Sequence, residues 1–192
     1  MLIRPEREVD IAHVQHVNEA AFARPAEAAL VEALRAAGAV IASLVAEEAG
    51  QIVGHILFSP ARLISHSKSA ATPTSALKMP QSNVMVTAGA TAAERPIAAL
   101  GPMAVLPAWQ GRGVGSQLVR AGMDVCREAG YDLVIVLGHI DYYPRFGFRP
   151  APPLGIRWEH GADAHFMVME LQPGALAGAR GIVRYRPEFD GV

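Results

Sequence analysis

Residues 100–115 read LGPMAVLPAWQGRGVG and pass from an apolar segment through a glycine-rich turn. We predict a strand over Ile97–Val105 before this turn and a helix over Gly113–Ala129 after it. Glycines between a strand and a helix let the backbone approach an anion closely, and the first N–H groups of the helix are free to bind it. The turn therefore predicts a phosphate-binding site.

Two common phosphate-binding motifs fit this turn badly. A P-loop ends in Gly-Lys followed by Ser or Thr, but Gly115 is followed by Ser116 and Gln117. A dinucleotide-binding fingerprint laid on Gly111 and Gly113 needs a third Gly or Ala where Ser116 stands. The residues leave open another kind of phosphate site, or a glycine turn without a ligand.

The segments around the turn show helical and extended patterns in alternation. Apolar residues at near-helical spacing predict helices over residues 9–22 and 25–37 and a short one over residues 142–146. Further strands are predicted over residues 40–47, 52–64, 132–137 and 165–171. Residues 132–137, DLVIVL, are typical of a buried parallel strand, whereas the first two strands suit a hairpin turning at Ala49-Gly50. The pattern predicts a mixed α/β fold.

Two regions lack a strong pattern. Residues 65–95 are rich in Ser, Thr, Ala and Pro, and a segment of this length and composition predicts a flexible insertion within one domain that spans residues 1–192. The tail from Gly174 to Val192 is expected to be loop-like.

Composition excludes several classes of protein. The formal net charge is −1 and no block of Lys or Arg occurs, so nucleic acid is not an expected partner. The most apolar run, AVIASLVA from Ala39, is far shorter than the about 20 residues that cross a bilayer, and the charged start lacks a signal-peptide core. We therefore expect a cytoplasmic protein with no membrane partner.

Cysteine and histidine usage argues against disulfides and metals. Cys126 is the single cysteine, so it forms no internal disulfide, and its place well inside a predicted helix indicates packing more than nucleophilic catalysis. No two histidines stand four residues apart, the spacing of a helical metal site, and His55 is alone on a predicted strand. No metal is expected.

Three features together carry a resemblance to a known family. The pattern Gln110-x-x-Gly113-x-Gly115 after LGPMAVLP resembles the coenzyme A pyrophosphate loop of the GNAT superfamily of N-acetyltransferases. The strand LVIVLG over residues 133–138 follows at a suitable distance, and YYPRFGF over residues 142–148 is similar to the family's tyrosine–glycine–phenylalanine signature. The resemblance runs roughly from residue 39 to residue 171 and is closer to a bacterial subgroup with LGPMAV and YYPRFGF type segments.

The resemblance implies a fold and a reaction. The fold would be a central mixed, splayed sheet of about six to seven strands flanked by about four helices. The reaction would be direct transfer of an acetyl group from acetyl-CoA, as cosubstrate, to a primary amine on a small molecule or peptide. By resemblance, the pantetheine arm would lie along Met103, Ala104 and Val105, and the pyrophosphate would be held by Gln110, Gly111, Arg112, Gly113, Val114 and Gly115, with His139 close to the cofactor.

The resemblance also implies one catalytic side chain. Tyr143 stands four residues before Gly147 and matches the tyrosine that the family uses to protonate the coenzyme A sulfur, with its neighbour Tyr142 as the rival. A backbone N–H near Met103–Val105 would donate to the oxyanion.

The identity of the general base is left open by the sequence, because the predicted strand Ile97–Val105 contains no acidic residue. The candidates are Glu94, Glu47, Glu48, His139 and Asp141.

Other readings stay open at this point. The missing strand carboxylate also suits a non-catalytic acyl-CoA sensor, and the small residues of LGPMAV do not exclude an acyl group longer than acetyl. Trp158 and Phe166 would line an acceptor pocket or complete the core. The identity of the acceptor and the oligomeric state, including a homodimer, are left undetermined by the sequence.

Overall fold

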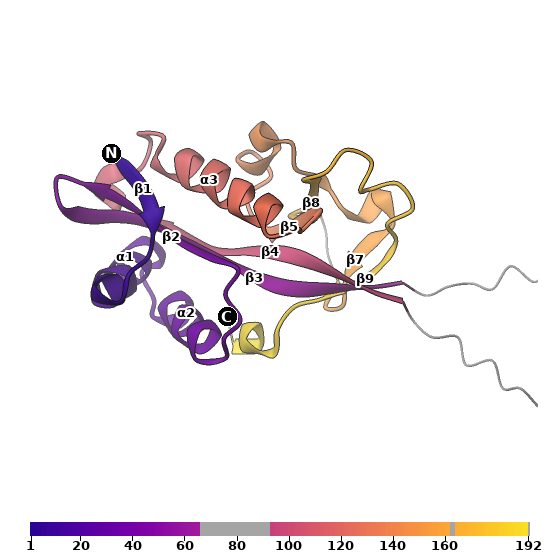
Figure 1. Cartoon of the computed structure of the whole chain (residues 1–192), viewed down its shortest axis with the longest axis horizontal. Helices are drawn as coiled ribbons and strands as arrows, with labels where there is room; N and C mark the ends of the chain where they lie inside the picture. Colours follow the sequence, from indigo (N-terminus) through magenta and orange to yellow (C-terminus); the bar gives the residue numbers. More distant parts are fainter. Residues whose placement is uncertain (66–92, 162–163, 192) are drawn as a thin grey trace, which may run out of the picture.

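The computed structural model describes residues 1–65, 93–161 and 164–191, which build a mixed β-sheet between helices (Figure 1). The sheet has nine strands among these residues, in the order β1-β2-β3-β4-β5-β8-β6, with β9 paired to both β3 and β7. Pairing is antiparallel except between β4 and β5 and between β7 and β9. The strands are β1 (Leu2–Pro5), β2 (Ala42–Glu48), β3 (Gln51–Ser65), β4 (Ala93–Val105), β5 (Leu133–Leu137), β6 (Arg149–Pro150), β7 (Ile156–Trp158), β8 (Phe166–Glu170) and β9 (Gly181–Arg184).

Helices cover both faces of the sheet. Figure 1 shows α1 (Ile11–Phe22) and α2 (Ala26–Ala36) on one face and α3 (Val114–Glu128) on the other. Short 3-10 turns complete the set: η1 (Glu8–Asp10), η2 (Pro107–Trp109), η3 (Tyr143–Phe146), η4 (Pro152–Leu154) and η5 (Pro187–Gly191). The predicted mixed fold is thereby confirmed, and the short helix expected at residues 142–146 is the 3-10 turn η3.

Helix α3 lies close to the sheet because a glycine faces it. A Cβ atom placed on Gly122 would come within 2.1 Å of a ring carbon of Phe58, whose side chain is fully buried in β3. Glycine therefore lets the helix axis approach the strand, and the apolar face of α3 seals this side of the core. The buried positions on that face are Val114, Leu118, Val119, Gly122, Met123 and Cys126.

The sheet opens between β4 and β5. Strand β4 pairs with β3 over nearly its whole length, but its parallel pairing with β5 covers only Ala98–Leu100. Beyond Leu100, β4 continues to Val105 without a partner on its β5 side, while β5 ends at Leu137. A splayed edge of this kind leaves backbone N–H and C=O groups of β4 available to a ligand.

The segment predicted as an insertion is shorter than expected at its ends. Ser65 and Ala93 are paired at the far ends of β3 and β4, so residues 93–95 belong to a strand. Residues 66–92 of the predicted insertion lie outside the described residues.

The prediction of a loop-like tail is wrong over two segments. Residues 181–184 form β9, which pairs with Arg62–Ile64 of β3, and η5 follows. The four residues of β9 are too few to show a recognisable alternation of apolar and polar side chains. Their hydrogen bonds are made to strands that are remote in sequence. Within the described residues, no helix is long and apolar enough to cross a bilayer.

Candidate active site

The glycine-rich turn has an open, left-handed backbone. Gly111 and Gly113 have φ angles of 72° and 79°, and a Cβ atom on either would meet nothing within 4 Å. Helix α3 starts at Val114 with Gly113 as N-cap and no side-chain hydrogen bond to the cap. No side chain therefore caps the first N–H groups of α3, and an anion bound at the turn could accept from them.

This turn borders a groove of about 460 Å³. We call it the glycine-turn groove, and it is lined by Ala21, Phe22, Met103, Val105, Trp109, Gln110, Gly111, Gly113, Val114, Gly115, Ser116, His139, Tyr142 and Arg145. The lining thus includes most of the residues predicted to hold a cofactor, from both the free edge of β4 and the turn. Two predicted residues, Ala104 and Arg112, are not in this lining. The Ala104 side chain is buried in the core, and Arg112 lies over the ring of Trp109, which itself lines the groove.

The charges around the groove favour an anion. Arg145 stacks over the ring of Tyr142 at 4.6 Å, and Arg112 stacks over Trp109 at 5.1 Å. No carboxylate occurs among the described residues that line the groove. Helix N–H groups, guanidinium groups and the absence of lining acids together fit a diphosphate.

A second cavity, of about 370 Å³, adjoins the groove. We call it the apolar cavity. It shares Phe22, Met103 and His139 with the groove, so the two spaces meet at these side chains. Its other lining residues are Arg24, Glu27, Leu30, Leu100, Gly101, Pro102, Leu137, Gly138, Tyr143, Trp158, Tyr185 and Phe189.

The two adjacent tyrosines face different spaces. Tyr142 lines the groove, where its hydroxyl lies only 2.7 Å from the position of a Cβ atom on Gly115. Tyr143 lines the apolar cavity, is 6% exposed, and packs edge-on against Tyr142 and Phe148. Burial, with a smaller contribution from Tyr142, raises the pKa of Tyr143 well above its ordinary value. The Tyr143 hydroxyl therefore stays protonated at neutral pH.

Most of the candidate bases line neither space. Glu47 accepts a hydrogen bond from Arg4 at 2.7 Å, Glu48 pairs with the terminal ammonium group at 2.6 Å, and Glu94 pairs with Arg62 at 2.7 Å. Asp141 is exposed and is absent from both linings. His139 alone among the candidates lines both the groove and the apolar cavity.

One carboxylate of the apolar cavity was missed by the sequence analysis. The buried Glu27 accepts hydrogen bonds from Arg24 Nε at 3.0 and 3.1 Å. In the sequence, this pair is an ordinary charge pair three residues apart at the start of a helix. Only the packing of α2 beside the open edge of β4 places Glu27 in the lining of the apolar cavity.

The remaining predicted residues divide between cavity and core. Trp158 lines the apolar cavity, whereas Phe166 is fully buried in the core. Cys126 is buried in α3 and lines neither space, and burial raises the pKa of its thiol to about 12. A thiol of this kind is a poor nucleophile at neutral pH.

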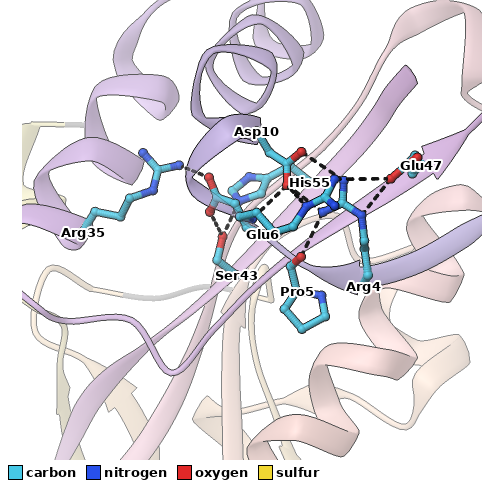
Figure 2. Close-up of polar contacts among 9 residues, drawn as sticks. Arg4, Pro5, Glu6, Asp10, Arg35, Ser43, Glu47 and His55 are labelled. Atoms are coloured by element: carbon cyan, nitrogen blue, oxygen red, sulfur yellow. Dashed lines mark hydrogen bonds and ion pairs between the residues drawn. The ribbon is translucent and has the colours of Figure 1, made fainter. Parts of the chain in front are cut away.

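A buried polar network lies on β1–β3, apart from both spaces (Figure 2). His55 is fully buried, with Nδ1 3.1 Å from Asn18 Nδ2 and Nε2 2.9 Å from Ser43 Oγ. Ser43 Oγ donates to Glu6, which also accepts from Arg35 at 2.5 Å. Burial, reinforced by the charge of Arg35, lowers the pKa of His55 to about 3. The neutral imidazole therefore joins α1, β2 and β3.

The fold and these two joined spaces define an acyltransferase of the acetyltransferase class. The model of the acetyltransferase (GNAT) family matches residues 11–148. The uncharacterized N-acetyltransferase YhbS of Escherichia coli (strain K12) is 32% identical over 193 residues, which covers 99% of each chain. The chain therefore belongs to the GNAT family and is an N-acetyltransferase by class.

Two solved structures of relatives agree with this assignment. The crystal structure of Escherichia coli YhbS in complex with CoA is 30% identical, has a TM-score of 0.78, and is matched over 98% of this chain and 91% of that chain. A GNAT family acetyltransferase from Brucella melitensis, in complex with acetyl-CoA, is 36% identical with a TM-score of 0.70, over 98% of this chain and 97% of that one.

Proposed function

We propose that the protein transfers an acetyl group from acetyl-CoA directly to a primary amine carried by a small molecule or peptide. The observation that carries the proposal is the junction of two unlike spaces at Met103 and His139. One space suits a diphosphate and a narrow chain, and the other suits an apolar acceptor. The complexes of the two relatives with CoA and acetyl-CoA support the choice of cosubstrate.

The chain offers a binding residue for each part of acetyl-CoA. The N–H groups of residues 110–115 would hold the diphosphate, with Arg112 and Arg145 supplying positive charge. The free edge of β4 at Met103–Val105 would bind the pantetheine arm through its backbone. His139 would lie beside the thioester, because it lines both spaces.

The bound cosubstrate supplies a thioester carbonyl as the acetyl donor. A C–N bond forms as the C–S bond breaks, so the amine gives up a proton and the departing sulfur takes one. His139 would receive the amine proton at the junction of the spaces. A backbone N–H of Met103–Val105 would donate to the carbonyl oxygen as negative charge develops there. Tyr143, kept protonated by burial, would donate to the sulfur.

Calorimetric titration with acetyl-CoA tests the binding part of the proposal. Gly113→Asp places a carboxylate at the N-terminus of α3, and we expect its affinity to fall by at least about 10-fold from charge repulsion. Gly130→Asp is the matched control, because Gly130 also has a left-handed φ and open space but lies beyond the other end of α3. Equal losses in both variants would mean that backbone strain, and not the groove, explains the effect.

Turnover tests the rest of the proposal. The wild-type protein is incubated with acetyl-CoA and a panel of primary amines, and released CoA thiol is measured. We expect turnover with at least one amine. Binding of acetyl-CoA without turnover on any acceptor would contradict transfer and indicate an acyl-CoA sensor. The same assay is repeated with a longer acyl-CoA, and turnover with that donor alone would contradict acetyl as the transferred group.

A further inference from the structure

An exposed arginine of helix α3 lies just beyond the glycine-turn groove. Ser116 lines the groove, and Arg120 stands four residues later in the same helix, where it is exposed. Side chains four residues apart lie on nearly the same face of a helix, and four residues advance the helix by about 6 Å. Arg120 therefore lies on the face of α3 that borders the groove, about one turn further from the glycine turn.

Two aromatic rings fix where the Arg120 guanidinium lies relative to the groove. Its central carbon lies over the ring of Phe146 at 5.5 Å, and Phe146 packs against Tyr142 with ring centroids 5.4 Å apart. Arg145 lies over the ring of Tyr142, and both of these residues line the groove. The pair of rings thus carries one guanidinium at the groove and a second one, that of Arg120, beside it.

Neither guanidinium is neutralised by a carboxylate of the protein. Asp124 stands four residues after Arg120, the usual spacing of a helical ion pair, but its carboxylate pairs with Arg127 at 2.6 Å. Arg145 donates to the backbone carbonyl of Asp141. In the part of the chain that the structure describes, no carboxylate forms an ion pair with Arg120 or Arg145. Two cations on neighbouring rings without a counter-charge favour an anionic ligand.

Coenzyme A presents a second anion close to its diphosphate. Its ribose carries the diphosphate on the 5′ oxygen and a separate phosphate monoester on the 3′ oxygen, so a few bonds separate the two anions. A phosphate monoester has a charge of about −1.5 to −2 near pH 7, and its oxygens accept from the planar fork of an arginine. When the diphosphate lies at the N-terminus of α3, Arg120 is the next cation along this face of the helix.

We propose that Arg120 binds the 3′-phosphate of CoA, so that the enzyme selects CoA over dephospho-CoA, the analogue that lacks this phosphate. The inference rests on the proposed use of acetyl-CoA. Arg145 lines the groove and would contact the diphosphate, which both forms of the cosubstrate carry. The ring of Phe146 would hold the Arg120 side chain in place, which reduces the entropy that the side chain loses on binding.

Calorimetric titration with CoA and with dephospho-CoA isolates the contribution of the 3′-phosphate and does not require turnover. Arg120→Gln removes the charge at an exposed helical position, and Arg120→Lys gives a second comparison if that variant is unstable. Arg157→Gln is the matched control, because Arg157 is an exposed arginine of β7 that lines neither space. All titrations use one ionic strength, since salt screens contacts between exposed charges.

We expect the wild type to bind CoA about 10-fold more tightly than dephospho-CoA, as a charge-assisted contact to phosphate predicts. Arg120→Gln should weaken CoA binding about 10-fold and dephospho-CoA binding less than about twofold. Arg120→Lys should keep an intermediate preference for CoA, because an ammonium group retains the charge without the planar fork. Arg157→Gln should match the wild type with both ligands, whereas Arg145→Gln should weaken the binding of both.

Three results would overturn the inference. The first is equal affinity of the wild type for CoA and dephospho-CoA. The second is a wild-type preference for CoA that persists in Arg120→Gln, since the 3′-phosphate would then bind elsewhere. The third is an equal loss of affinity for both ligands in Arg120→Gln, which would mean a general effect of charge. Each of these leaves acetyl-CoA as the cosubstrate, whereas a wild type that binds no CoA would contradict the proposed function itself.

Discussion

Tyr142 and Tyr143 show how much the direction of a single side chain matters. Successive residues of a 3-10 turn point about 120° apart, so neighbours in the chain contact different surroundings. The hydroxyl of Tyr142 lies over Gly115 in the glycine-turn groove, whereas Tyr143 is buried at the apolar cavity. Each tyrosine lines a different one of the two joined spaces, and substitution distinguishes their roles.

We predict that Tyr143→Phe lowers kcat by about 100-fold with little change in the affinity for acetyl-CoA, because only the proton donor is lost. Tyr142→Phe is the matched control and should keep kcat within about threefold. Steady-state kinetics with one amine acceptor and calorimetry with acetyl-CoA measure both quantities. Since burial raises the pKa of Tyr143, wild-type kcat should show no loss from its deprotonation up to about pH 10. The reverse pattern between the variants would assign the proton donor to Tyr142.

At the scale of elements, the buried network on β1–β3 connects strands to helices. His55 of β3 contacts Asn18 of α1 and Ser43 of β2. Figure 2 shows Ser43 and Arg35 of α2 both reaching Glu6, which follows β1. These contacts hold the helices that carry one wall of the apolar cavity. Because the network accommodates a neutral imidazole, its stability depends on pH.

We predict that acid weakens the fold through His55. Its pKa is about 3 in the folded state and about 6.5 when unfolded, so the unfolded state binds an extra proton between these values. The contribution of His55 to the free energy of unfolding is complete above pH 6.5. It is lost as the pH falls towards 3, at up to about 1.4 kcal/mol per pH unit. Urea unfolding at a series of pH values measures the loss.

The variant His55→Gln should show a shallower fall in the free energy of unfolding between pH 6.5 and pH 4.5 than the wild type. His16→Gln, at an exposed position of α1, is the control and should keep the wild-type slope. The lowered pKa of Asp10, which comes first from its hydrogen bond with Arg4, acts mainly at lower pH, as that carboxylate gains its proton. Equal slopes for His55→Gln and wild type would contradict the role of His55.

At the scale of the whole molecule, the two spaces are assembled from distant parts of the chain. Helices α1 and α2 supply one wall, the open edge of β4 and the end of β5 supply the floor, and the last residues close the apolar cavity. Figure 1 shows η5, at the yellow end of the chain, beside α2, although the two are far apart in sequence. The C-terminal segment is therefore part of the site.

We predict that Phe189→Ala raises the acceptor KM by about 10-fold, because its ring packs on Tyr185 and lines only the apolar cavity. The affinity for acetyl-CoA should change by less than about twofold. Asp190→Ala, at an exposed position of the same 3-10 turn, is the control. Kinetics at varied acceptor and calorimetry with acetyl-CoA give the two values. Parallel loss of both would mean that the segment stabilises the fold and does not shape the cavity.

The sequence alone determined the features that depend on neighbouring residues. The glycine turn at 111–115, the helix after it and the apolar run of residues 133–137 each have a local pattern, and together they predicted the family and most of the glycine-turn groove. Local patterns suffice here because turn geometry and helix periodicity are set by nearby residues.

Only the tertiary structure decided what completes the apolar cavity. In the sequence, Glu27 belongs to an ordinary charge pair at the start of a helix, and Tyr185 lies in a tail without periodicity. Trp158 suits an acceptor pocket and the core equally well. Strand pairing between β7, β9 and β3 and the packing of η5 near α2 bring these side chains together. Contacts between remote segments leave no regular spacing in the sequence, because they depend on how the whole sheet is ordered.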